Sequence, residues 1–208
     1  MAKQDGMTDW DMLAEATGKP GPEAREAMDL QSRQLGMVVG GSLSEGLRVR
    51  LKRETEIEDI AVGRYVIIQG LKRLFFGMIT DINLDITNPA MERTPPDMSD
   101  EFLRRVHLGT SAYGRLDVTP LLILLENEAE PRPVKQVPAH YAPVFHATPE
   151  EVNRVFGQAD EHHLRIGHPI EMEDATIHID LARLVERSVG IFGKSGTGKS
   201  FLTRILLS

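Results

Sequence analysis

A glycine-rich loop close to the carboxyl end is the feature that most limits the folds open to this 208-residue chain. It reads VGIFGKSGTGKS, from Val189 to Ser200. Residues 193–200 match the phosphate-loop pattern G-x-x-x-x-G-K-[S/T] at every defined position. The apolar run before the loop predicts a buried strand, and the run after it, FLTRILLS, has apolar residues at helical spacing. A strand, a phosphate loop and a helix in this order indicate the start of an α/β nucleotide-binding domain.

The residue types in the loop suit a nucleoside triphosphate. Glycines let successive backbone N–H groups turn toward an anion, and the following helix adds its positive amino-terminal end. Lys199 is the candidate catalytic residue because its ammonium would reach the β- and γ-phosphates, while the Ser200 hydroxyl would join the ligands of Mg²⁺. We therefore expect ATP and Mg²⁺ as cofactors and a nucleotide site made of Gly193, Lys194, Ser195, Gly196, Thr197, Gly198, Lys199 and Ser200. A chance match is the alternative, and the flanking strand and helix patterns argue against it.

Two segments precede the P-loop region. Residues 1–35 are polar and predict a helical arm, with Thr8 as a helix cap and Pro22 opening a second helix that ends at Gly36. Residues 36–145 contain β-rich runs separated by glycines, which predict a small antiparallel β-barrel. The predicted strands are Leu47 to Lys52, Tyr65 to Gln69, Leu74 to Ile82 and Leu116 to Glu126.

A proline-rich stretch marks the expected boundary between the barrel and the third segment. Residues 126–144 hold four prolines and few aliphatic side chains, which is typical of an extended linker. Thr148, Pro149 and Glu151 then form a capping box for a short helix that stops at Gly157. We take residues 146–208 as the start of the P-loop domain. The predicted fold class is therefore α+β, with an amino-terminal antiparallel β-barrel followed by the beginning of an α/β P-loop domain.

Composition limits the partners and the compartment. A formal net charge of −7 argues against a surface that coats nucleic acid or anionic membrane, so any polyanion site must be local. The chain has no cysteine, which fits a reducing compartment, and we expect a cytoplasmic protein. The densest apolar run, LLILL at Leu121 to Leu125, is far too short to span a bilayer, so no contact with a membrane is expected.

The motifs GSLSEGLRVRL, VGRYVIIQG and FFGMITDI, together with the later segment IHIDLARLVERSVGIFGKSGTGKS, resemble stretches of HerA-type DNA translocases of the HerA/FtsK superfamily. The motifs GSLSEGLRVRL, VGRYVIIQG and FFGMITDI resemble the HAS barrel that precedes the ATPase core in that family. The later segment IHIDLARLVERSVGIFGKSGTGKS is similar to the family's lead-in to its phosphate loop. The resemblance covers residues 36–208. It does not extend to the helical arm or to the proline-rich insertion around Pro89 to Pro96.

This resemblance implies a ring-forming motor. The barrel would help to assemble a homo-oligomer, a hexamer, and would dock a nuclease or another effector, while a RecA-like core would move duplex DNA with ATP. Only eight residues follow the loop, so we expect these 208 residues to be the front part of a longer protein and to be inactive alone. Two alternatives stay open at this point: a non-catalytic module for oligomerisation and partner binding, and another P-loop ATPase such as a conjugation-type coupling ATPase.

Overall fold

The computed structural model describes residues 22–88, 90–93, 99–102, 112–125, 128, 130–157, 160–186 and 188–207. Contacts between Cα atoms divide the chain into two compact units, residues 1–148 and residues 149–208, and each is described by itself. The helix expected after Thr8 lies outside the described residues.

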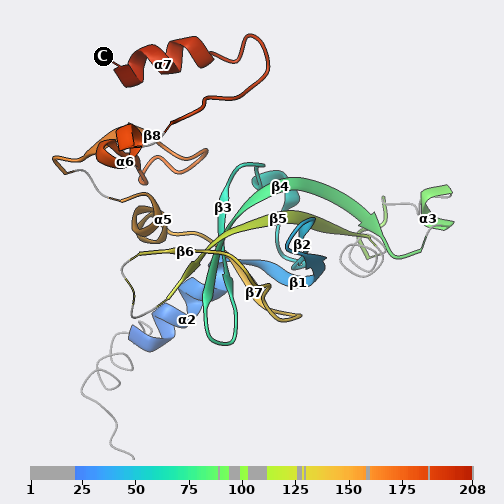
Figure 1. Cartoon of the computed structure of the whole chain (residues 1–208). Coiled ribbons are helices and arrows are strands. Elements are labelled where there is room, and N and C mark those ends of the chain that lie inside the picture. The colour runs from blue at the N-terminus through green and yellow to red at the C-terminus, as the bar shows by residue number, and fades with distance from the viewer. Residues whose placement is uncertain are drawn as a thin grey trace, which may run out of the picture. The chain divides into compact units, whose positions relative to one another are not determined.

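A helix leads directly into the first strand of the first unit (Figure 1). Helix α2 covers Pro22–Arg33, and strand β1 follows at once over Gln34–Ser42. The helix predicted to open at Pro22 is therefore confirmed, but it ends three residues before the expected stop at Gly36. The reason lies in strand pairing: Gly36 is aligned with Leu51 of the next strand, so the backbone there is already extended.

Six antiparallel strands of the described chain close into a barrel, which confirms the predicted fold class of the first unit. Around the barrel their order is β1, β2, β5, β4, β3, β7 and back to β1. Figure 1 shows β4 and β5 as two long strands lying side by side and running out toward α3. The remaining bounds of this unit are Gly46–Leu51 (β2), Ile57–Asp59 (the short helix η1), Tyr65–Gln69 (β3), Leu74–Ile86 (β4), Ala90–Arg93 (α3), Ala112–Leu124 (β5), Arg132–Pro133 (β6, paired with β5) and Pro143–His146 (β7).

Every second side chain of a barrel strand is buried, and these buried side chains fill the barrel. In β2 the apolar side chains are buried, whereas Arg48 is exposed and Arg50 is half-buried with its guanidinium 4.1 Å from the centre of the Tyr113 ring. A strand with period-two burial places one face on the core and the other in solvent. The core gathers residues from all six barrel strands, including Leu35, Val38, Leu47, Val49, Val66, Ile68, Ile79, Leu116, Val118 and Val144.

Strand β7 corrects the sequence-based expectation of a linker over residues 126–144. Strand β7 pairs with both β1 and β3, so it closes the barrel. Val144 and Phe145 are buried in it. The strand was missed because it has only four residues and follows a run of prolines, so its stability comes from pairing on both sides and not from its own pattern. Strands β4 and β5 also exceed the predicted runs, by four residues each at their shared outer end.

The second unit begins with the helix that the capping box predicted. Helix α5 covers Pro149–Phe156 and buries Val152 completely. Strands β8 (His163–Gly167) and β9 (Ile177–Asp180) form a small antiparallel sheet, and α5 packs against β9. Helices α6 (Leu181–Glu186) and α7 (Lys199–Leu207) follow.

Candidate nucleotide-binding site

Residues 193–198 of the phosphate loop lie between α6 and α7, and Lys199 and Ser200 are the first residues of α7. Gly196 and Gly198 have φ angles of 83° and 81°, in the left-handed region that side chains rarely adopt. A Cβ on Gly193 would lie 2.9 Å from the Thr197 hydroxyl oxygen, so that position has no room for a side chain without a shift. When left-handed residues alternate with right-handed ones, successive backbone N–H groups turn toward one point. This arrangement is a concave anion nest, which suits a phosphate group.

Three donors of the loop converge on one carbonyl oxygen, that of Lys194. The Lys199 ammonium donates to it at 2.6 Å and the Thr197 hydroxyl at 2.8 Å, with the Thr197 amide at 3.4 Å. Lys199 therefore already has its charged end at the loop, while its backbone starts α7. The loop lacks a negatively charged group of its own at this point, so the ammonium is held only by a neutral oxygen.

Helix α7 extends the loop in the predicted way. The Leu202 amide donates to the Gly198 carbonyl oxygen at 2.9 Å, which forms the first turn at the end of the loop. The first amides of a helix have no partner within the helix and attract anions. The apolar side chains that show helical spacing are exposed in this unit: Phe201 by 70%, Leu202 by 42% and Ile205 by 49%. Such a face is suited to cover a sheet.

The carboxylate of Asp180 caps the helix that precedes the loop. In the sequence this aspartate stands within the segment IHIDLARLVERS. Asp180 ends β9 and caps α6, where its side chain accepts a hydrogen bond from the Arg183 amide at 3.0 Å. This bond is the main reason why the pKa of Asp180 lies below its usual value. The Arg183 guanidinium also lies 3.4 Å from the other carboxylate oxygen. The signal that could have identified this role is an aspartate followed directly by a helical pattern.

The strand expected over Val189 to Phe192 is not formed in the described structure. No bridge partner is present for these residues among the described strands, and Val189 is 57% exposed and Phe192 94% exposed. A strand of a parallel sheet depends on neighbouring strands for its hydrogen bonds and on helices for its burial. Without such neighbours the apolar pattern alone does not form a strand over these residues.

The residues of the loop fit a nucleoside triphosphate with Mg²⁺. The donors are backbone amides and an ammonium, and the two left-handed glycines give the cradle its shape. Gly193 through Thr197 would surround the phosphates, Lys199 would contact them, and the Ser200 hydroxyl, at the first turn of α7, would be the protein ligand of Mg²⁺.

Among the described helices, none combines the length and apolarity that crossing a membrane requires.

Two separate parts of the chain are similar to known protein families. Residues 35–125 match the family model of the HAS barrel domain, and residues 164–208 match the model of the central domain of helicase HerA. A probable helicase of Methanocaldococcus jannaschii, MJ1565, is 35% identical over 65 residues, which are 31% of this chain and 12% of that helicase. The chain thus spans a small share of the length of this relative. The chain is thus similar to the HAS barrel domain in its first part and to the central domain of helicase HerA in its last part.

Proposed function

We propose that this chain is the front part of an ATP-dependent, ring-forming DNA translocase or helicase. One observation carries the proposal: a complete phosphate-loop motif, with left-handed glycines at its turn, lies within the segment that matches the HerA central domain and follows a HAS barrel. In related folds this loop is the element that grips the phosphates of ATP.

In this proposal the loop residues bind and orient ATP–Mg²⁺, which supplies the phosphoryl group for the reaction. Lys199 contacts the phosphates as a point charge, Ser200 holds the metal ion, and the amides of the loop bind the phosphate oxygens. Hydrolysis also needs an acid behind Mg²⁺, a residue that orients water and an arginine finger. We propose that other parts of a complete central domain supply these groups and contact duplex DNA.

The barrel takes the assembly role in this proposal. Its core is enclosed by six paired strands, so the outer face of the barrel is not needed to cover that core. Apolar side chains are exposed outside this core, among them Leu71 in the turn between β3 and β4, 92% exposed, and Leu84 in β4, 79% exposed. Single exposed apolar side chains are common on protein surfaces, so these leave room for a protein contact without marking one. We propose that the barrel joins subunits into a hexameric ring and docks a nuclease or another effector.

The test is DNA-stimulated ATP hydrolysis by a protein that joins these 208 residues to a complete central domain. Lys199→Ala removes the ammonium at the loop and should abolish hydrolysis. Arg204→Ala is the control, because it removes an exposed positive charge from α7 outside the loop residues 193–200. If Lys199→Ala hydrolyses ATP at the rate of the unchanged protein, the proposed motor function is wrong.

A further inference from the structure

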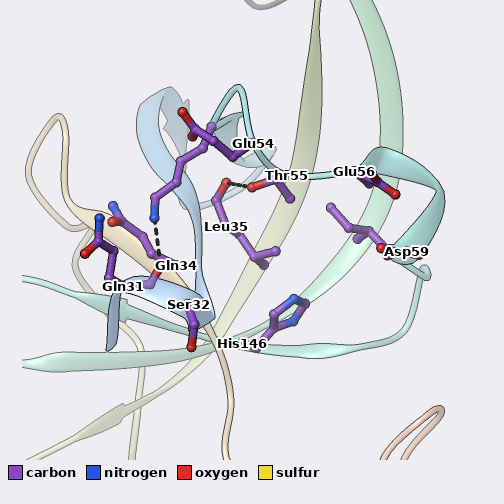
Figure 2. A pocket seen from close by; sticks show the side chains of 11 residues that line it. Gln31, Ser32, Gln34, Leu35, Glu54, Thr55, Glu56, Asp59 and His146 are labelled. Atoms are coloured by element: carbon purple, nitrogen blue, oxygen red, sulfur yellow. Dashed lines mark hydrogen bonds between the residues drawn. The ribbon is translucent and has the colours of Figure 1, made fainter. Parts of the chain in front are cut away.

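A polar pocket of about 850 Å³ opens at the end of the barrel where α2 runs into β1. Figure 2 shows Gln31, Ser32 and Gln34 on one side of it, Glu56 and Asp59 on the other, and His146 between the two sides. The buried side chains of Leu35 and Ile60 also contribute to its wall. Its volume suits a long side chain or a short stretch of peptide.

The lining of the pocket carries an excess of negative charge. Glu54, Glu56 and Asp59 line it with exposed carboxylates, and within the part of the chain that the structure describes none of them is in an ion pair. The single lysine of the lining, Lys52, donates its ammonium to the Gln31 carbonyl oxygen at 3.0 Å. Among the lining residues three negative charges face one positive charge, so the side of the pocket with Glu54, Glu56 and Asp59 favours a cationic group.

His146 adds hydrogen-bonding capacity but little charge. Its Nδ1 atom is buried and has no hydrogen-bond partner among the described residues. Burial, followed by the charges of Arg64 and Arg33, lowers the pKa of His146 to about 4, so the ring is neutral near pH 7. Both guanidinium groups have contacts of their own: Arg33 lies 3.9 Å from the Asp29 carboxylate, and Arg64 donates to the Asp59 carbonyl oxygen at 3.4 Å.

A basic, exposed tip lies at the other end of strand β3. His146 is aligned with Val66 near the start of β3, whereas the turn of residues 70–73 follows Gln69 at its end. Leu71 at the tip is 92% exposed and Lys72 beside it is exposed. The acid that lines the hollow next to the tip, Glu128, is already paired with Arg132 at 2.5 Å.

We propose that the pocket receives the β3–β4 tip of a second copy of this chain, with Lys72 between the carboxylates and Leu71 over the apolar wall. The charges are complementary, and the two surfaces lie at opposite ends of β3, so each copy can offer its tip to one neighbour and its pocket to another. A head-to-tail contact of this kind is the one that generates a ring of identical subunits. The inference rests on the ring-forming part of the proposed function and names the contact that would join neighbouring subunits.

The experiment measures self-association of the 208-residue chain by sedimentation velocity over a range of concentrations. Lys72→Glu and Glu56→Lys should each weaken association by at least about tenfold, because like charges then meet in the contact. The double variant Lys72→Glu/Glu56→Lys should regain most of the loss, since the pair is restored with the charges exchanged. Circular dichroism confirms that the variants, which are at exposed positions, keep the barrel fold.

Matched controls are available beside each surface. Glu58→Lys changes an exposed acid of η1, two residues after Glu56, that does not line the pocket. Lys135→Glu changes an exposed lysine outside the tip. Neither control should alter association. Rising salt should weaken the association of the unchanged chain, because the contact depends on charges near solvent.

Three results would overturn the inference. If the unchanged chain associates and both single variants associate equally well, the ring forms through another surface, and the proposed motor function stands. If the double variant is weaker than either single variant, the tip and the pocket do not meet. If the unchanged chain is monomeric at every concentration, the contact is wrong, while ATP hydrolysis by the complete domain still decides the motor function independently.

Discussion

Replacing His146 with glutamine should remove a pH-dependent loss of stability from the barrel. Burial and the nearby Arg64 and Arg33 charges lower the pKa of His146 from 6.5 to about 4 in the folded chain. Below pH 6.5 the unfolded chain therefore takes up a proton that the folded chain does not. The free energy of unfolding falls as the pH goes from about 6.5 to about 4, and no further loss from this group occurs below that range.

The size of the effect follows from the shift. A shift from 6.5 to about 4 corresponds to about 3 kcal/mol if the ring were shielded from water. The ring is only part-buried at the edge of an open pocket, so solvent screening reduces this to about 1–2 kcal/mol. Glutamine keeps a polar side chain at the site but cannot titrate.

The assay is urea unfolding of the 208-residue chain near pH 7 and near pH 4.5, followed by the tyrosine signal in circular dichroism. All three tyrosines lie in the barrel unit, so this signal reports on that unit. Between the two pH values His146→Gln should lose about 1 kcal/mol less stability than the unchanged chain. His140→Gln removes an exposed imidazole and serves as the control. Equal losses in the unchanged chain and in His146→Gln would refute this reasoning.

Three further substitutions test the packing of the two units. Gly36→Ala should destabilise the barrel by at least about 2 kcal/mol in urea unfolding, because the new Cβ would lie 2.0 Å from the Arg50 carbonyl oxygen; Gly167→Ala, with no atom within 4 Å, should cost far less. Arg115→Met should cost about 1–2 kcal/mol, and less in high salt, because two carboxylates at 2.9 and 3.4 Å lose their partner; equal stability in high and low salt would contradict an ionic role. Val152→Ala should lower the melting temperature of the second unit, since this side chain is fully buried between α5 and its neighbours, and an unchanged value would mean that α5 does not hold that unit together.

The barrel strands could be predicted where the side-chain pattern alone determines burial. The run Tyr65 to Gln69 is β3 without change, and the alternating run from Leu47 is β2 within one residue at each end. Strand β7 could not be predicted, because its four residues are held by β1 and β3, which are distant in sequence. Long-range pairing of this kind leaves no local pattern.

In the candidate sites, too, some features follow from the local sequence and others arise only from the fold. The phosphate loop could be identified in full, because contiguous residues carry its glycines and its lysine, and their backbone conformation follows from residue type. The strand before it was predicted from apolar residues but lacks strand neighbours in the described structure. The pocket around His146 was not found, because its walls come from α2, the turn after β2 and the end of β7. Only the fold brings these segments together.

The binding of ATP–Mg²⁺ tests the central claim most directly. Isothermal titration calorimetry on a protein that joins this chain to a complete central domain should show one nucleotide site per subunit. Lys199→Ala should weaken binding by about ten- to a hundredfold, the value expected for losing hydrogen bonds from a charged group. Arg204→Ala, which changes an exposed residue of α7 outside the loop, should bind as the unchanged protein does. If the unchanged protein gives no heat of binding, or if Lys199→Ala binds ATP equally well, the loop at Gly193 to Ser200 is not a nucleotide site and the proposed motor is wrong.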